Sequence, residues 1–296
     1  MMFGRNFRLL AKQFGLEFDQ ALPYPHVSLY FWRPEDGSVN FGDFLSLVVV
    51  DQVLRQFGRT LHDETPRPAR LLALGSILHL ATNHNVIWGA GLNGRAGQED
   101  LRKDVRKLDV RAVRGPMTQE IVRRRGIDVP DVFGDPALLV PLLFPNRFKR
   151  TSRKPWVFVP NLHDLTIDHR SPPPHTISPL GSWNKRIEAI LEADLVLASS
   201  LHALVIAEAY GIPARYVRLS ESEALFKYRD YYQGTGRCEF KFATNLEQGL
   251  EMGGAPPPVF DPQRLVDAFP IDLWQVGSER RSFAGVQLNG ALQGRH

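Results

Sequence analysis

Short apolar runs that end in small or polar residues recur along the chain and predict the strands of parallel sheets. The run at 195–198 reads Leu-Val-Leu-Ala and is followed by two serines. Runs of this kind are typical of strands that are buried on both faces. Comparable runs, each a predicted strand, occupy residues 27–32, 71–74, 86–88, 110–113, 156–159 and 215–219.

Helical patterns separate these runs, and we expect helices over 41–57, 117–125, 183–193, 202–210, 224–232 and 261–268. The segment 202–210 is apolar on nearly every side, and the Gly211 and Pro213 that follow it are residues that end helices. Alternating strands and helices predict an α/β protein, in which ligands bind at the carboxyl ends of the strands. Four residues fall at such an end: Ser199, Ser200, Leu201 and His202.

His202 is the first functional candidate in the sequence. The free N–H groups and the dipole at a helix N-terminus favour a bound anion, and an imidazole there can move a proton to or from it. The alternative is a histidine that only hydrogen-bonds a neighbouring loop.

Composition limits the class of protein. The chain has 296 residues, enough for two domains of ordinary size. Its hydrophobic content of 43% is typical of a globular protein, and a net charge of +4 suits acidic substrates or a membrane surface rather than nucleic acid. One cysteine, Cys238, excludes an internal disulfide and fits a reducing compartment.

A polar, basic stretch at 147–155 predicts a linker between two domains. The N-terminal domain then covers 25–146 and the C-terminal domain 156–255, and a helix and tail at 256–296 are expected to cross back. In the extension at 1–24, apolar residues recur at helical spacing with basic residues between them. Such an amphipathic helix either lies on a membrane or docks on its own domain.

Polar residues also follow the predicted strands of the first half. Asn40 and Asp43 flank Gly42 where a strand passes into a helix, and together they form either a hydroxyl-binding edge or a simple helix cap. Asp135 has the same two interpretations. Arg114 precedes a helix N-terminus, where it either makes a bidentate contact to an anion or lies on the surface.

Taken in order, four motifs make the chain resemble the polysaccharide pyruvyl transferase family. They are the loop at 40–43, the Arg-Gly-Pro in 113–116, the Gly-Asp-Pro at 134–136, and the Leu-His, helix and Gly-Ile-Pro of 201–213. The resemblance implies two Rossmann-like domains that face a cleft, as in GT-B glycosyltransferases. It places the acceptor on the N-terminal domain and the donor on the C-terminal one.

The resemblance also implies an activity. Members of the family use phosphoenolpyruvate to form a pyruvate ketal on two hydroxyls of a sugar, in bacterial exopolysaccharide or cell-wall glycan assembly. No cofactor is expected beyond this donor. The expected acceptor is an oligosaccharide linked to polyprenyl diphosphate, so the protein is expected in the cytoplasm, peripherally at the inner face of the membrane.

Residue roles follow from the same resemblance. Ketal formation requires a proton on the methylene carbon of the donor, and His202 is the expected acid, with Asp43 orienting or deprotonating the acceptor hydroxyl. Many members carry arginine where this chain has Ser200, and Lys227 or Arg229 is expected to replace it. The expected donor-binding residues are Arg114, Ser199, Ser200, Leu201, Lys227 and Arg229, and the expected acceptor-binding residues are Asn40, Gly42, His163 and Asp135.

No metal site is expected, because the histidines lack i,i+4 pairing with carboxylates and the one cysteine has no partner. Two rival functions stay open. One is a GT-B-type glycosyltransferase that uses a sugar nucleotide. The other is a glycan-binding protein without catalysis, which the serine at position 200 favours.

Overall fold

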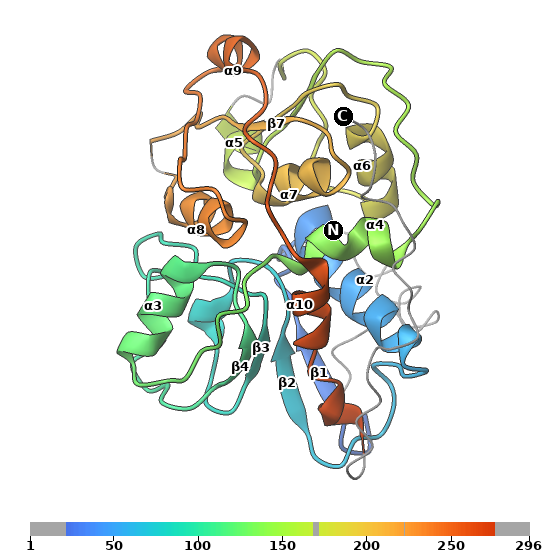
Figure 1. Ribbon diagram of the computed structural model, residues 1–296, viewed down its shortest axis with the longest axis vertical. Helices are drawn as coiled ribbons and strands as arrows, with labels where there is room; N and C mark the ends of the chain where they lie inside the picture. The colour runs from blue at the N-terminus through green and yellow to red at the C-terminus, as the bar shows by residue number, and fades with distance from the viewer. Residues whose placement is uncertain (1–21, 168–171, 222, 276–296) are drawn as a thin grey trace.

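The computed structural model describes residues 22–167, 172–221 and 223–275, and they form two parallel sheets with helices around them (Figure 1). The first sheet has the order β1-β2-β3-β4. Its strands are β1 (Val27–Tyr30), β2 (Ala69–Leu72), β3 (Val86–Trp88) and β4 (Asp109–Ala112). The second sheet has the order β5-β6-β7. Its strands are β5 (Val157–Val159), β6 (Val196–Ala198) and β7 (Ala214–Tyr216).

Both sheets confirm the predicted α/β class, because all of their strand pairs are parallel. Within each sheet the strands follow one another in chain order. A dinucleotide-binding fold instead reverses its strand order and binds its ligand at that point. Among the described strands there is no such reversal, and a large cavity opens between the two halves.

The helices connect the strands, and two short ones escape the sequence pattern. They are α2 (Phe41–Gln56), α3 (Pro116–Arg124), α4 (Val140–Leu143), α5 (Leu162–Ile167), α6 (Trp183–Ile190), α7 (Leu201–Ala209), α8 (Phe226–Gly234), α9 (Leu246–Met252) and α10 (Pro262–Asp267). Three 3-10 turns are η1 (Leu78–Leu80), η2 (Pro136–Leu139) and η3 (Ile271–Trp274). The sequence predicts neither α5 nor α9, since six or seven residues give too little periodicity.

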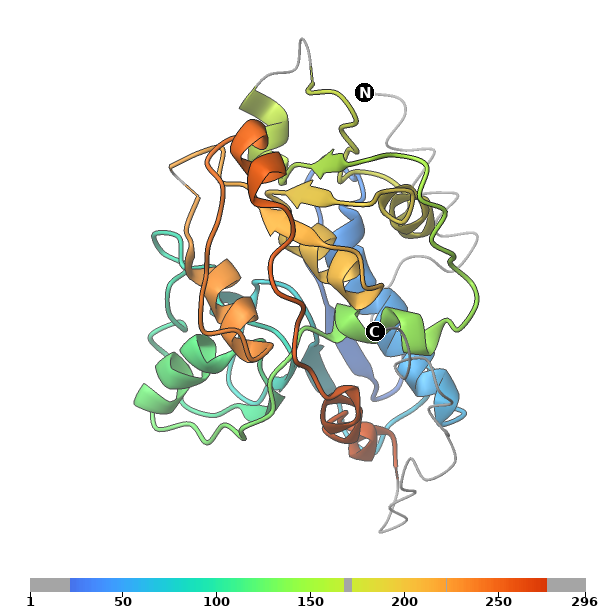
Figure 2. The ribbon, with the colours of Figure 1, turned by 45° about the horizontal axis from the view of Figure 1, so that its top comes forward.

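Helix α7 is the central element of the second half. Its residues from Leu201 to Glu208 are all buried, as expected for a helix with no polar face. It packs beneath β6 and β7 and also against α2 and η2 of the first half. Figure 2 shows α2 running beside α7.

One apolar cluster therefore extends through both halves, from Val27 to Trp274. The C-terminal segment returns to the first sheet: Trp88 Nε1 donates to the carbonyl of Leu265 at 2.8 Å, and Trp274 Nε1 donates to that of Thr60 at 3.0 Å. The boundaries placed around 147–155 stay a prediction.

Two further expectations concern the membrane. The predicted N-terminal amphipathic helix falls within residues 1–21, outside the described residues. Among the residues that the structure describes, no helix is both long and apolar enough to span a bilayer.

Candidate active site

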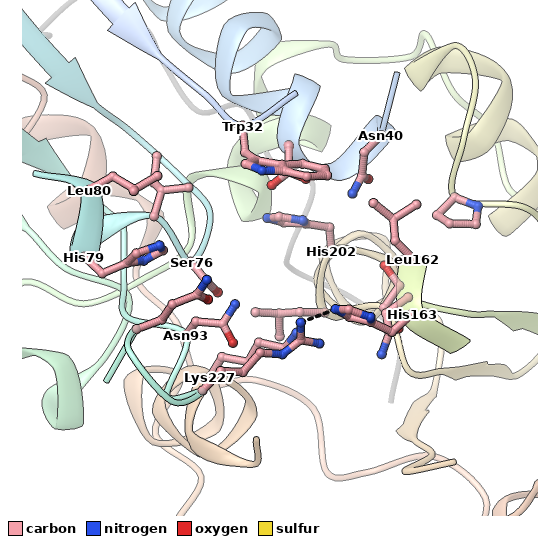
Figure 3. Close-up of a pocket in the computed structure, with 18 of the residues that line it drawn as sticks. Trp32, Asn40, Ser76, His79, Leu80, Asn93, Leu162, His163, His202 and Lys227 are labelled. Carbon is pink, nitrogen blue, oxygen red and sulfur yellow. Dashed lines mark hydrogen bonds between the residues drawn. The ribbon is translucent and has the colours of Figure 1, made fainter. Parts of the chain in front are cut away.

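A cavity of about 760 Å³ lies at the carboxyl ends of the strands, between the two halves (Figure 3). Parallel strands direct their following loops to one edge of the sheet, so segments that are distant in sequence meet there. The lining residues are Tyr30, Trp32, Asn40, Asp43, Ser76, Ile77, His79, Leu80, Asn93, Arg95, Gln98, Asn161, Leu162, His163, Pro179, Ser200, Leu201, His202 and Lys227.

His202 lies on the first turn of α7, next to an acidic residue. Its Nε2 is 3.9 Å from Oδ2 of Asp135, and neither atom has a hydrogen-bond partner. Asp135 is completely buried, and its other oxygen caps η2 by accepting from the N–H of Ala137 at 3.0 Å. The structure thus makes Asp135 both a cap and the neighbour of the imidazole. It does not line the cavity.

The loop at 40–43 contributes a cap and a carboxylate. The side chain of Asn40 accepts from the N–H of Gly42 at 3.1 Å, which makes Asn40 the N-cap of α2. Asp43 stands in the first turn and is free of that role. Burial raises the pKa of Asp43, although the nearby His202 and Lys227 act in the opposite direction. Asp43 lines the cavity and can hold a hydroxyl or take its proton.

Two cations share one buried carboxylate at the opposite wall. Glu223 pairs with Lys227, whose Nζ lies 2.5 Å from Oε1, and with Arg95. Arg95 also pairs with His163 on α5. Burial alone would raise the pKa of Glu223, but the two cations outweigh it and lower that pKa. Burial lowers the pKa of Lys227, and Glu223 offsets part of that effect.

Several polar atoms around the cavity are buried without a hydrogen-bond partner. They are His79 Nδ1, Asn93 Oδ1, Arg95 Nε, Asn161 Nδ2 and His202 Nε2. Buried polar groups are nearly always satisfied, by water if by nothing else. A cluster of unsatisfied ones at a single cavity is therefore what a polar ligand site requires.

Arg114 corrects one expectation. Its guanidinium is completely buried and does not line the cavity. Instead it pairs with Asp230 on α8 at 2.9 Å, and Asp230 also accepts from the backbone and hydroxyl of Thr118 at 2.9 and 2.7 Å. The helix N-terminus does attract an anion, but that anion is a side chain of the protein itself.

Two other residues expected to bind the donor, Arg229 and Ser199, also lie outside the cavity lining. Arg229 is exposed on α8 and lies over the ring of Phe240, away from the cavity. Ser199 is buried, where its hydroxyl accepts from the N–H of Asn161 and its carbonyl accepts from Tyr228. Of the predicted residues, the cavity brings together Asn40, Asp43, His163, Ser200, Leu201, His202 and Lys227.

Sequence reasoning missed three residues that line the cavity: Asn93, Arg95 and Trp32. Arg95 and Asn93 lie in the loop after β3, where no periodic pattern marks a contact. Trp32 follows β1 and reads simply as a strand residue. Within the described parts of the chain, no group of three or more His, Cys, Asp or Glu side chains is arranged to hold a metal ion.

A family model and a curated protein match this chain in sequence. The sequence model of polysaccharide pyruvyl transferases matches residues 40–221, more than half of the chain. The succinoglycan biosynthesis protein ExoV of Rhizobium meliloti (strain 1021) is 30% identical over 217 residues, which cover 70% of this chain and 64% of that protein. The chain thus spans just under two thirds of the length of this curated relative.

A solved structure, that of an uncharacterized protein from Klebsiella pneumoniae subsp. pneumoniae NTUH-K2044, matches 81% of this chain and all of its own, with a TM-score of 0.41 and 14% identity. The family assignment rests on the sequence match. That match includes the loop at 40–43, the buried Arg114 and the turn that carries His202. The chain therefore belongs to the polysaccharide pyruvyl transferase family.

Proposed function

We propose that this chain transfers pyruvate from phosphoenolpyruvate to two hydroxyls of a sugar in an exopolysaccharide, forming a pyruvate ketal and releasing phosphate. The observation that carries the proposal is the placement of Lys227 and Arg95 on one buried carboxylate, Glu223, in the cavity that holds His202. Two cations and one anion leave one positive charge for the donor.

Magnitudes indicate which groups hold the donor. An ion pair at about 4 Å gains about 4 kcal/mol at an effective dielectric near 20. The N-terminus of a helix adds about 0.3–1 kcal/mol to the binding of an anion. At the N-terminus of α7 the side chain of Ser200 makes no capping hydrogen bond. The donor's phosphate and carboxylate are thus held mainly by Lys227 and Arg95. These two cations take the place of the arginine that many members carry at position 200.

The reaction needs an acid at the methylene carbon and an acceptor for hydroxyl protons. His202 donates a proton to that carbon, which makes the neighbouring carbon electrophilic. The first sugar hydroxyl attacks this carbon and loses its proton to Asp43. The bond from carbon to phosphate oxygen then breaks, phosphate leaves with the electron pair, and the second hydroxyl closes the ketal while its proton goes to phosphate.

In this proposal the donor lies between Lys227 of the second half and Arg95 of the first, and the acceptor lies against the first half. Both ligands bind in the cavity between the two halves, an arrangement like that of GT-B enzymes. The acceptor is an oligosaccharide on a lipid diphosphate at the inner face of the cytoplasmic membrane. In the basic stretch at 147–155, Arg150 pairs with Asp194 and Lys154 pairs with Glu192 at the surface.

The test supplies the full chain with phosphoenolpyruvate and membranes that carry a lipid-linked oligosaccharide. We expect phosphate release that requires both, and a new ketal methyl signal in the NMR spectrum of the glycan. Consumption of a sugar nucleotide without these products would support the glycosyltransferase. Glycan binding without any turnover would support the non-catalytic protein.

Two substitutions in α8 test which of its cations binds the donor. Lys227→Met removes a cation from the cavity, whereas Arg229→Met removes one from the exposed side of the same helix. The loss of an interaction worth about 1.4 kcal/mol raises a KM about tenfold. We expect at least that increase in the KM for phosphoenolpyruvate with Lys227→Met and no change with Arg229→Met. Equal effects of the two variants would contradict the assignment.

A further inference from the structure

Trp32 is an exposed aromatic residue on the wall of the cavity. Two other tryptophans, Trp88 and Trp274, are buried and each donates its indole N–H to a backbone carbonyl. Trp32 is 38% exposed instead, the one aromatic among the large apolar side chains that the described residues leave exposed. A single large apolar side chain at the surface is common, but one that lines a polar cavity is placed to contact a ligand.

The backbone of β1 explains why Trp32 is there. Side chains alternate along a strand, so Val27, Leu29 and Phe31 enter the core. Tyr30, the last residue of β1, and Trp32, two residues further on, both line the cavity. The guanidinium of Arg70 lies 4.5 Å from the centroid of the Tyr30 ring. The strand thus presents two aromatic rings to one ligand.

The polar groups beside this aromatic wall are those that recognise hydroxyls. Figure 3 shows Trp32 close to Asn40 and His202, with Lys227 and Asn93 on the other side of His202 in this view. Asp43 lines the same cavity. A pyranose has a face of C–H groups and an edge of hydroxyls, which match an indole face and a set of carboxylate and amide groups.

From this arrangement we infer that Trp32 and Tyr30 form the acceptor subsite, in which a pyranose ring stacks on Trp32 with its hydroxyl edge toward Asp43 and His202. The inference rests on the proposed function, because it takes the ligand to be the saccharide acceptor. It divides the cavity into a cationic wall for the donor and an aromatic wall for the sugar, with His202 between them.

The test uses the full chain, with Trp32→Phe and Leu250→Ala as control variants. Three probes are used: methyl β-D-glucopyranoside, methyl β-D-galactopyranoside and methyl α-D-mannopyranoside. Stacking on an indole shifts sugar C–H protons upfield, and we expect such shifts for at least one probe with the wild type. Trp32→Ala abolishes them and Trp32→Phe retains them in part. Leu250→Ala, matched in exposure at 40% and outside the cavity, leaves them unchanged.

Kinetics give the second readout. Trp32→Ala is expected to raise the KM of the oligosaccharide acceptor about tenfold and to leave the KM of phosphoenolpyruvate within about twofold. If the enzyme is active and Trp32→Ala leaves the KM of the acceptor unchanged, the stacking on Trp32 is refuted and the proposed transfer reaction is not. Trp32-dependent shifts without any ketal product would support the subsite and refute the transfer reaction. Binding of uridine diphosphate that depends on Trp32, or no shift with any probe, would overturn the inference.

Discussion

Gly42 on α2 lies directly against the imidazole of His202 on α7. A Cβ placed on Gly42 would come within 2.3 Å of Nδ1 and 2.7 Å of the Cβ of His202, closer than real carbon contacts allow. The two halves of the molecule thus meet at the candidate acid itself. Glycine is needed at this position for the close approach, and not for an unusual backbone angle.

Gly42→Ala is therefore expected to displace the His202 ring. Alanine favours a helix over glycine by up to about 1 kcal/mol, but a forced overlap in a packed site costs about 1–3 kcal/mol. We expect a lower free energy of unfolding in urea and at least a tenfold loss of pyruvyl transfer. Gly249→Ala on α9 is the control, since the atoms nearest to its Cβ are methyl groups of Leu197 and Val217 at 3.1 and 3.2 Å. Transfer at the wild-type rate by Gly42→Ala would show that His202 need not occupy its place.

Asp135→Asn tests the carboxylate behind His202. The amide oxygen can still cap η2, but an amide N–H replaces the oxygen that lies 3.9 Å from Nε2. An imidazolium then has no anion beside it, and the lost acid function lowers kcat by about 10²–10⁴-fold. The free energy of unfolding is expected to stay within about 1 kcal/mol of the wild type, because the cap remains. A kcat that is unchanged over the pH range would separate Asp135 from the chemistry.

Arg114→Met distinguishes a structural arginine from one that binds the donor. Removing one partner of a buried ion pair leaves the other uncompensated and costs about 3–5 kcal/mol. We expect this loss in urea unfolding, with the KM for phosphoenolpyruvate unchanged in whatever protein stays folded. Arg111→Met is the control, since Arg111 pairs with Asp109 and Asp272 at the surface, where such pairs contribute about 0–1 kcal/mol. A stable Arg114→Met protein with a raised donor KM would restore the donor-binding role.

Much of the fold could be predicted from local pattern alone. The apolar runs identify the strands and the all-apolar helix α7, because burial on every side leaves its mark within a few residues. They do not give the order of the strands in the sheets, which depends on contacts between distant segments. His202 was found because a histidine at a strand-to-helix junction is informative without knowledge of the rest of the fold.

The role of Arg114 could not be predicted in the same way. Its partner Asp230 lies 116 residues later in the chain, and the sequence around Arg114 contains no pattern that indicates this pairing. Arg95 escaped detection for a similar reason, because the loop after β3 has no period and its partner Glu223 belongs to the other half. Lys227, which was predicted to stand in for the missing arginine, does line the cavity. Local sequence thus supplies candidates, and the tertiary fold decides which of them face the ligand.

Asp43→Asn is expected to make the protein more stable and less active. Burial raises the pKa of Asp43 above its ordinary 3.8, so the folded state holds the proton more tightly than the unfolded chain does. The stability that this group contributes is full below the ordinary pKa and is lost as the pH rises through the raised pKa, because burial penalises the ionised carboxylate. Asparagine has no such penalty, so relative to the wild type the variant should gain free energy of unfolding above the raised pKa and lose the gain as the pH falls below the ordinary 3.8. Its transfer activity should fall, and the acid limb of the wild-type kcat/KM profile should disappear.

The control is Asp36→Asn, at an exposed carboxyl whose pKa is lowered by hydrogen bonds to Ser38. This variant should show no such gain in stability. An Asp43→Asn protein that is less stable at pH 7 and fully active would mean that this carboxylate belongs to the scaffold rather than to the acceptor.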